Sequence, residues 1–126
     1  MNIVLFNRDE FFVIELNNVM FFKAEDHYTN VYYDKEFKQL LPFGLSQVES
    51  AITEEGKGHN FIRAGRSHLI NAEKVLHVSA TKETMTLMGD NGKVATIHIP
   101  KNIIKELTQA FKDERSRQKE AGSADN

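Results

Sequence analysis

The chain has 126 residues, of which 40% are hydrophobic and 27% charged, and its formal net charge is -2. This length suits one domain with its own core, and no apolar run is long enough to cross a bilayer. The chain starts without the basic segment and apolar stretch of a secretory signal. Cysteine is absent, which excludes disulfides, thiol nucleophiles and zinc-thiolate sites. We therefore expect a cytoplasmic protein without membrane contacts.

Charge is distributed unevenly along the chain. Residues 1–55 hold four Lys/Arg and ten Asp/Glu, whereas residues 56–111 hold eight and four. The second half could form a basic patch that attracts a polyanion, or the unevenness could be chance in a mixed surface. The sequence pI near 6.2 argues against a protein that binds nucleic acid indiscriminately.

The first third of the chain predicts two hairpins of β-branched and aromatic residues. Their strands are 11–16 with 19–24, joined by Asn17-Asn18, and 29–33 with 37–41. Pro42 ends this sheet because proline cannot donate to a strand ladder. Between the hairpins, Glu25-Asp26-His27 is best interpreted as a solvated turn.

A helix is predicted from Leu45 onward. Its apolar positions Leu45, Val48 and Ile52 have helical spacing, and Ser46 with Glu49 predicts a capping box. Gly56-Lys57-Gly58 would end the helix.

The second half predicts further strands and a closing helix. Extended segments are expected at 61–63, 75–80, 85–88 and 94–99, with turns at 81–83 and 89–92. Pro100 suits the first turn of a helix whose apolar stripe is Ile103, Ile104, Leu107 and Phe111. We expect one domain over residues 1–111 and a charged, disordered tail over 112–126.

These elements predict a mostly β fold with a short mid-chain helix and a C-terminal helix. Helix-turn-helix spacing is missing, so any DNA contact would come from loops or strands. The five histidines lack the spacing of a metal site, and no phosphate loop or serine elbow is present. We expect no enzymatic activity, no metal and no cofactor.

The run Phe61–Asn71, "FIRAGRSHLIN", is the most informative segment. Arg63 and Arg66 flank the small residues Ala64 and Gly65, so a partner surface could approach closely. A guanidinium matches phosphate oxygens or the O6/N7 edge of guanine. Either arginine could equally pair with an acidic neighbour.

The segments "VMFFKAEDHYTNVYY", "LPFGLSQVESAI", "FIRAGRSHLINAEKV" and "IHIPKNIIKEL" resemble, in order and spacing, the LytTR family of bacterial DNA-binding domains over residues 10–111. The central segment is similar to the family signature Phe-x-Arg-x-His-Arg-Ser-x-x-Val-Asn. It keeps the residues Phe61, Arg63, Arg66, Ser67 and Asn71. Gly65 stands where the family usually has histidine, and Ile70 replaces valine.

This resemblance implies an elongated arrangement of small antiparallel β-sheets whose loops enter successive major grooves and bend the duplex. Tyr28 matches one reader position, at which neighbouring His27 could substitute for it or assist. Arg66 matches the second position and Lys101 the third. Arg63 is also a candidate DNA contact, ranked below Arg66 because it could instead pack and pair internally. Asn71 is expected to cap or turn the chain, and Phe61, Leu69 and Ile70 to lie in the core.

The sequence thus predicts a sequence-specific DNA-binding transcriptional regulator. Its expected partner is double-stranded DNA with repeated sites, with a dimer on DNA and a further signalling partner as open options. The few residues before Phe11 hold no receiver domain, so we expect a stand-alone module. The alternative is a β-rich protein-interaction module of the same fold that has lost DNA binding.

Overall fold

The computed structural model describes residues 2–55 and 60–121, with side chains up to residue 113. The strands are β1 (Asn2–Phe6), β2 (Phe11–Glu15), β3 (Phe21–Glu25), β4 (Tyr28–Tyr32), β5 (Lys38–Leu41), β6 (Phe61–Ala64), β7 (His68–Asn71), β8 (Val75–Ser79), β9 (Thr84–Met88) and β10 (Val94–His98). The helices are α1 (Leu45–Glu55) and α2 (Lys101–Ala121), and short 3-10 turns lie at Leu16–Asn18 and Ala72–Lys74. Within this part of the chain, no helix has the length and apolarity to cross a membrane.

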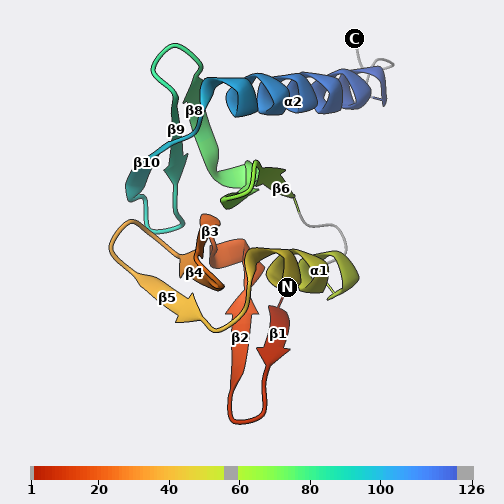
Figure 1. The fold of residues 1–126 in the computed structure, drawn as a ribbon. Helices are drawn as coiled ribbons and strands as arrows, with labels where there is room; N and C mark the ends of the chain where they lie inside the picture. Colours follow the sequence, from red (N-terminus) through yellow and green to blue (C-terminus); the bar gives the residue numbers. More distant parts are fainter. Residues whose placement is uncertain (1, 56–59, 122–126) are drawn as a thin grey trace.

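The strands form three small antiparallel sheets that follow one another along the molecule (Figure 1). One sheet pairs β1 with β2, the middle sheet has the order β5-β4-β3-β7-β6, and the third has the order β10-β9-β8. Helix α1 lies beside the middle sheet toward the β1–β2 hairpin, and α2 lies at the opposite end of the molecule (Figure 1). The predicted mostly β fold with two helices is confirmed.

The first predicted hairpin is wrong in its pairing. Strand β2 pairs with β1, which the sequence patterns did not indicate, while β3 pairs with β4 and β7. Asn7 favours the observed turn because its Oδ1 accepts from the backbone N–H groups of Asp9 and Glu10 at 3.0 and 2.9 Å. The 3-10 turn Leu16–Asn18 then carries the chain into the middle sheet with Val19 fully buried behind it.

The second predicted hairpin, β4 with β5, is confirmed. Its turn depends on Asp34, whose Oδ1 accepts from the backbone N–H groups of Glu36 and Phe37 at 2.7 and 2.6 Å. The other oxygen accepts from the Asn91 side chain at 2.9 Å. The two backbone hydrogen bonds are the main reason that the pKa of Asp34 is lowered. Asp34 therefore joins the middle sheet to the β9–β10 turn.

Helix α1 begins at Leu45 as predicted, but the capping box is wrong. Gly44 supplies the carbonyl that accepts from Val48 N–H, so Ser46 lies inside the first turn. Glu49 instead accepts from Arg63 Nη1 at 2.7 Å. The predicted stop at Gly56–Gly58 lies outside the described residues.

Helix α2 packs through the predicted apolar stripe. Ile104 and Leu107 are buried, and Ile103 and Phe111 pack against them from partly buried positions. The helical backbone continues to Ala121, so it includes the first ten residues of the segment expected as a disordered tail. Residues 122–126 lie outside the described part, and the domain boundary at residue 111 stays a prediction.

The middle sheet is buried on both faces, which explains the two hydrophobic clusters. Because side chains alternate along a strand, Phe22 and Leu69 join one cluster with α1 and the β1–β2 hairpin. Phe21 and Ile70 join the other with β8–β10 and α2. The predicted core positions Leu69 and Ile70 are confirmed.

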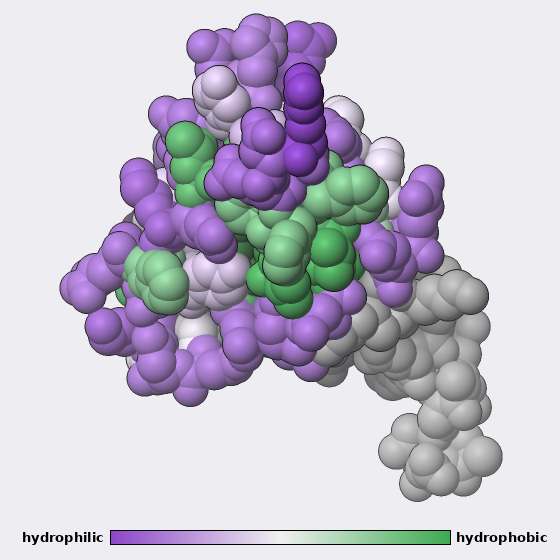
Figure 2. Space-filling model, turned by 90° about the horizontal axis from the view of Figure 1, so that it is seen from below, coloured by the Kyte–Doolittle hydropathy of each residue, from purple (hydrophilic) through white to green (hydrophobic). Residues whose placement is uncertain are grey.

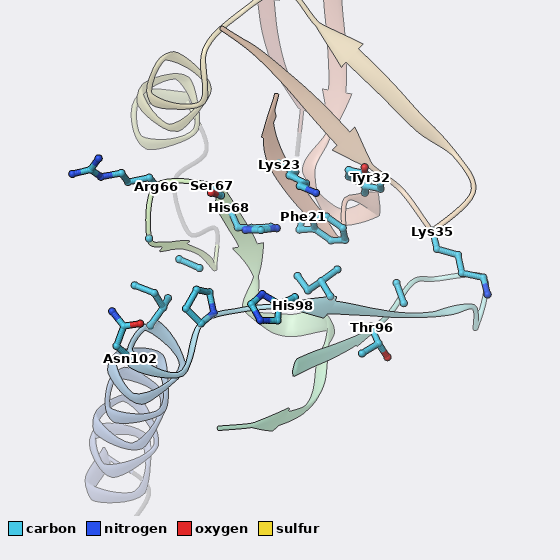
Figure 3. A pocket seen from close by; sticks show the side chains of 16 residues that line it. Phe21, Lys23, Tyr32, Lys35, Arg66, Ser67, His68, Thr96, His98 and Asn102 are labelled. Atoms are coloured by element: carbon cyan, nitrogen blue, oxygen red, sulfur yellow. The ribbon is translucent and has the colours of Figure 1, made fainter. Parts of the chain in front are cut away.

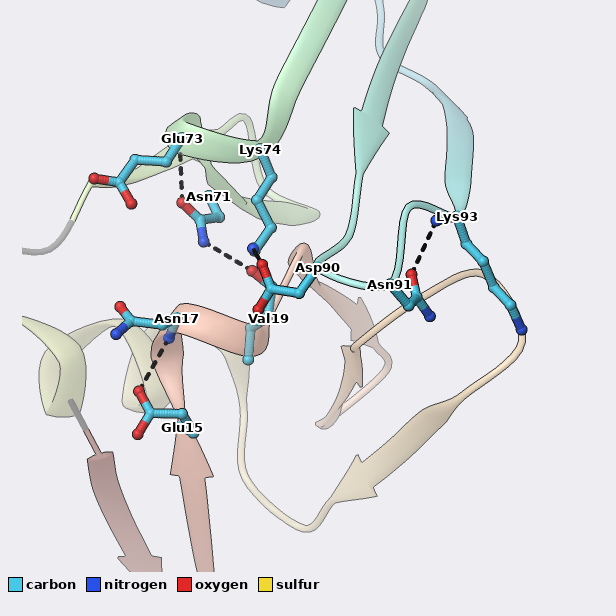
Figure 4. Close-up of polar contacts among 9 residues, drawn as sticks. All are labelled: Glu15, Asn17, Val19, Asn71, Glu73, Lys74, Asp90, Asn91 and Lys93. Atoms are coloured by element: carbon cyan, nitrogen blue, oxygen red, sulfur yellow. Dashed lines mark hydrogen bonds and ion pairs between the residues drawn. The ribbon is translucent and has the colours of Figure 1, made fainter.

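Asn71 and Lys74 connect these layers with polar contacts (Figure 4). Asn71 donates from Nδ2 to the Val19 carbonyl at 2.9 Å, and its Oδ1 accepts from Glu73 N–H at 3.1 Å. Lys74 pairs with Asp90 in the β9–β10 turn. The expected capping role of Asn71 is confirmed.

Candidate nucleic-acid interface

The run Phe61–Asn71 folds as a tight hairpin and not as one strand followed by a loop. Strands β6 and β7 pair antiparallel, with Phe61 opposite Asn71 and Ala64 opposite His68. The three residues between them form the turn. Gly65 begins it with φ of +65°, a left-handed conformation that glycine adopts without steric cost. Arg66 is thereby placed at the tip of a hairpin.

Arg63 braces this turn from inside, through the internal pairing that was the alternative to DNA contact for this residue. Its Nη1 pairs with Glu49 of α1 at 2.7 Å. Its Nε donates to the Gly65 carbonyl at 2.9 Å, and its Nη2 donates to the Arg66 carbonyl at 3.3 Å. One guanidinium thus joins α1 to two successive carbonyls of the turn. Such charge-assisted, multiply bonded arginines fix geometry as well as contributing energy.

Arg66 has the opposite environment. Its side chain is exposed and projects outward from the hairpin tip (Figure 3). Within residues 2–55 and 60–113, its guanidinium has no hydrogen bond and no acidic partner. The full donor set of a guanidinium is therefore available to another molecule.

The β3–β4 turn lies next to the Arg66 hairpin. The backbone N–H of Ala24, near the end of β3, donates to the Ser67 carbonyl at 2.7 Å. Asp26 takes φ of 59° in the turn, and His27 beside it is exposed. Tyr28 follows as the first residue of β4 with 48% of its surface exposed. The solvated turn expected at residues 25–27 is confirmed for Asp26 and His27, whereas Glu25 is the last residue of β3.

The start of α2 lies on the other side of the same hairpin. A Cβ on Gly65 would come within 3.4 Å of Ile103 Cδ1. Lys101 is exposed, but its backbone N–H donates to Glu83 Oε2 at 2.7 Å. A carboxylate thus already occupies the N-terminus of this helix, with His98 Nε2 at 3.9 Å from the other oxygen. Arg66 therefore lies between the segment of Tyr28 and the segment of Lys101.

A cleft of about 800 Å³ opens beside these segments, between the middle sheet and β10 with α2 (Figure 3). We call it the basic cleft. The side chains that define it are Phe21, Lys23, Tyr32, Lys35, Arg66, Ser67, His68, Thr96, His98 and Asn102. Sequence reasoning did not single out Lys23 and His68, because only the β3–β7 register places them opposite one another.

His68 is the most deeply placed polar group of the basic cleft. It is only 8% exposed, and its ring centroid lies 5.9 Å from that of Phe21. Burial, with a smaller contribution from the charge of Lys23, lowers the pKa of His68 to about 4. The imidazole is therefore neutral near pH 7 and offers one donor and one acceptor.

Comparison with known proteins identifies the fold family. A family model described as the LytTr DNA-binding domain matches residues 9–112. The chain belongs to the LytTR family. Its fold is similar to that of the LytTr DNA-binding domain of a protein described as a putative methyl-accepting/DNA response regulator from Bacillus cereus, with a TM-score of 0.57 and 22% identity over 87% of this chain and 95% of that one. A search of curated proteins finds no match.

Membership of the LytTR family suggests DNA binding and transcription regulation, and it makes DNA the indicated partner. LytTR is a family of DNA-binding domains and not of enzymes. In the part of the chain that the structure describes, no three His, Asp or Glu side chains gather as metal ligands.

Proposed function

We propose that this LytTR domain is a transcriptional regulator that reads double-stranded DNA through three neighbouring segments, in the cytoplasm of a bacterial cell. The segments are the β3–β4 turn with His27 and Tyr28, the β6–β7 turn with Arg66, and the start of α2 with Lys101. The three segments enter successive grooves along one face of the DNA. The duplex bends so that it contacts all three segments.

The observation that carries this proposal is the contrast between the two arginines of the signature. Arg63 is held by Glu49 and by the turn carbonyls, so its guanidinium supports the hairpin. Arg66 is exposed at the tip that this support positions. A turn backbone that is already ordered loses less freedom on binding, and the guanidinium of Arg66 can bond guanine O6 and N7 together. Arg66 is therefore the proposed base reader, and Arg63 a positioning residue.

The test begins with selection of bound duplexes from a random pool, which supplies a specific site. On that site Arg66→Ala should weaken binding by about 1–3 kcal/mol and relax the preference at one base position. Arg8→Ala, at the exposed β1–β2 turn, is the matched control and should bind like the native chain. Equal losses on specific and scrambled duplexes would remove Arg66 from base reading.

Lys101 has a different proposed role, in phosphate contact. Its loss should weaken specific and scrambled duplexes alike, because phosphate contacts carry no sequence information. Lys101→Ala should also flatten the dependence of binding on salt by about one unit of slope. Binding measured at several salt concentrations by fluorescence anisotropy gives both quantities, and an unchanged slope would exclude the phosphate contact.

A second function, contact with another copy of this chain, is favoured by the outer face of the β1–β2 hairpin. Val4 pairs with Val13 and Phe6 with Phe11, and all four side chains are exposed, Phe6 to 73%. Figure 2, which views the molecule from the hairpin end, shows apolar surface surrounded by hydrophilic residues. Four side chains are too few for the roughly 800 Å² per partner of a stable interface. The proposed contact therefore forms only where repeated DNA sites hold two copies close together.

A duplex with two selected sites distinguishes this contact from independent binding. The native chain should fill the two sites cooperatively, and Phe6→Ser with Phe11→Ser should abolish cooperativity while single-site affinity is unchanged. Leu76→Ser, at another exposed apolar position, is the control. If the chain binds no duplex in the selection but self-associates through this face, the protein-interaction alternative replaces DNA reading.

A further inference from the structure

The basic cleft carries charge of one sign. Lys23, Lys35 and Arg66 line it together with two histidines, and none of the described residues that line it is acidic. The whole chain has 18 acidic and 16 basic residues, so a cleft without any carboxylate is a local departure from the composition. Clefts lined by one sign of charge concentrate ions of the opposite sign. The charge of the basic cleft therefore favours an anion over a cation.

Lys23 and His68 place a charge and a hydrogen-bonding group at the same point. They face each other across the β3–β7 register, and both side chains point into the cleft (Figure 3). Within the described residues, neither side chain has a hydrogen bond or an acidic partner. His68 is more than nine-tenths buried, so its neutral imidazole reaches little other than the cleft. An anion at this point would meet an ammonium and an imidazole N–H.

The remaining wall is apolar and aromatic. Phe21 stacks on Tyr32 with ring centroids 4.5 Å apart and planes 15° apart. Ala64, Ile97 and Ile103 extend this wall across the cleft. The volume of about 800 Å³ lies within the range of roughly 300–1,000 Å³ in which small-molecule sites fall. A flat ring system fits such a wall, and a free inorganic anion would leave it uncovered.

A DNA backbone is a poorer occupant of this point than a small molecule. Duplex phosphates meet side chains that project from a surface, as Arg66 does. His68, in contrast, lies at the start of a central strand with 8% exposure. A small acid can enter the cleft and reach it.

We propose that the basic cleft binds a small aromatic carboxylate, with the carboxylate on Lys23 and His68 and the ring against Phe21 and Ile97. The site does not depend on the proposed DNA binding. It borders the Arg66 turn and the start of α2, so an occupant would lie beside two of the three proposed DNA segments.

The test uses the full chain with 2-naphthoate and its neutral isostere 2-naphthamide. Calorimetry should give an affinity about tenfold higher for the acid, because a charge-assisted hydrogen bond is lost in the amide. Backbone amide resonances of residues 65–68, 96–99, 101 and 102 should shift in saturable fashion. Equal affinity for both compounds, or shifts confined to other segments, would overturn the site.

Two variants locate the anion. Lys23→Met should remove the tenfold preference for the acid, and His68→Phe should reduce it while keeping a ring against Phe21. Lys82→Met, in the exposed turn before β9, should retain it. Unchanged preference in Lys23→Met would exclude the proposed carboxylate position.

The same variant separates this site from the DNA face. Lys23→Met should bind the selected duplex with an affinity within about twofold of that of the native chain. This difference is smaller than the free energy lost when one charged hydrogen bond is removed. A loss of duplex affinity comparable to that of Arg66→Ala would assign Lys23 to DNA contact and overturn the proposal. Naphthoate binding with no duplex binding would instead uphold the cleft and reject the proposed function.

Discussion

The β6–β7 turn and the start of α2 both present a basic residue, but the nearest carboxylate acts differently at each. In the turn, Glu49 pairs with Arg63 and leaves Arg66 unpaired. At the helix, Glu83 accepts from the backbone N–H of Lys101, so its negative charge stays beside Lys101. Because Arg63 neutralises Glu49, Arg66 stays available to another molecule. Glu83 caps the helix and keeps its negative charge, so it repels an incoming phosphate.

The histidines beside these two segments differ in exposure. His68, directly after the turn, is 8% exposed and neutral. His98, just before the helix, has 70% of its side chain exposed and lies 3.9 Å from Glu83. The turn is therefore held by Arg63 and followed by a buried histidine, whereas the start of the helix follows an exposed one. This contrast suits a base reader at Arg66 and a less specific phosphate contact at Lys101.

Of the substitutions in the two segments, Arg63→Ala should destabilise the β6–β7 turn most. It removes an ion pair and two hydrogen bonds from a charged donor, so the free energy of unfolding should fall by about 2–3 kcal/mol. Urea unfolding monitored by circular dichroism measures the change. Arg66→Ala is the matched control and should change stability by no more than about 0.5 kcal/mol. Equal effects of the two variants would contradict the division of roles between the arginines.

Acid should also destabilise the turn region through His68. Its pKa is lowered to about 4 in the folded chain, against about 6.5 in the unfolded chain. The folded state therefore disfavours the protonated form. This contribution to stability is complete above about pH 6.5 and falls as the pH decreases toward 4, with a loss of about 2–3 kcal/mol by pH 4.5.

Urea unfolding at pH 7 and pH 4.5 isolates this contribution when native and His68→Gln chains are compared. Asp34 also has a lowered pKa, and its contribution is lost in both chains as the pH falls. The native chain should lose more stability than the variant over this interval. Parallel losses would mean that His68 is protonated as readily in the folded chain as in the unfolded chain.

Gly65→Ala tests the contact between the turn and α2. The left-handed φ of Gly65 is strained for alanine, and the new Cβ would lie 3.4 Å from Ile103. The free energy of unfolding should fall by about 1–2 kcal/mol. Gly92→Ala is the control, since Gly92 has φ of +78° and a Cβ added there would meet no atom within 4 Å. A larger loss of stability in Gly65→Ala than in Gly92→Ala measures the contact with Ile103. Equal losses would mean that backbone strain is the whole cause.

Local patterns predicted the local elements of this fold well. The β4–β5 and β9–β10 hairpins follow from strand propensity around short turns, and α1 and α2 from apolar spacing. The prediction of the first hairpin failed because Asn17-Asn18 has the composition of a tight turn. The turn that joins paired strands is instead the β1–β2 turn, which Asn7 stabilises. Strand β1 was missed since its four apolar residues gave no turn signal of their own.

The site was predictable where it depends on local sequence. The signature run placed Arg66 in a loop beside small residues, and it left internal pairing of Arg63 as an alternative to DNA contact. The partners did not follow from local sequence, because Glu49 lies 14 positions from Arg63 and Glu83 lies 18 from Lys101. Pro100 predicted the start of a helix next to Lys101. The carboxylate of Glu83, which no local pattern indicates, accepts from the backbone N–H of Lys101 at this helix start.

Glu83→Gln should give the smallest change in stability, and it tests the role of the carboxylate at the start of α2. The amide oxygen can still accept from Lys101 N–H, but the negative charge at the helix N-terminus is lost. Stability should fall by about 0.3–1 kcal/mol, the usual size of a charge interaction with a helix terminus. Affinity for any duplex should rise by a few fold, since a charge that repels phosphate is removed.

The opposite signs of these two changes are what identify the role of Glu83. Urea unfolding gives the loss of stability, and fluorescence anisotropy on specific and scrambled duplexes gives the gain in affinity. Glu106→Gln, an exposed acid within the same helix, controls for the change in net charge alone. A gain no larger than that of Glu106→Gln would mean that the capping carboxylate does not face the DNA. Lys101 would then lose its place among the proposed contacts, while Arg66 would keep its own.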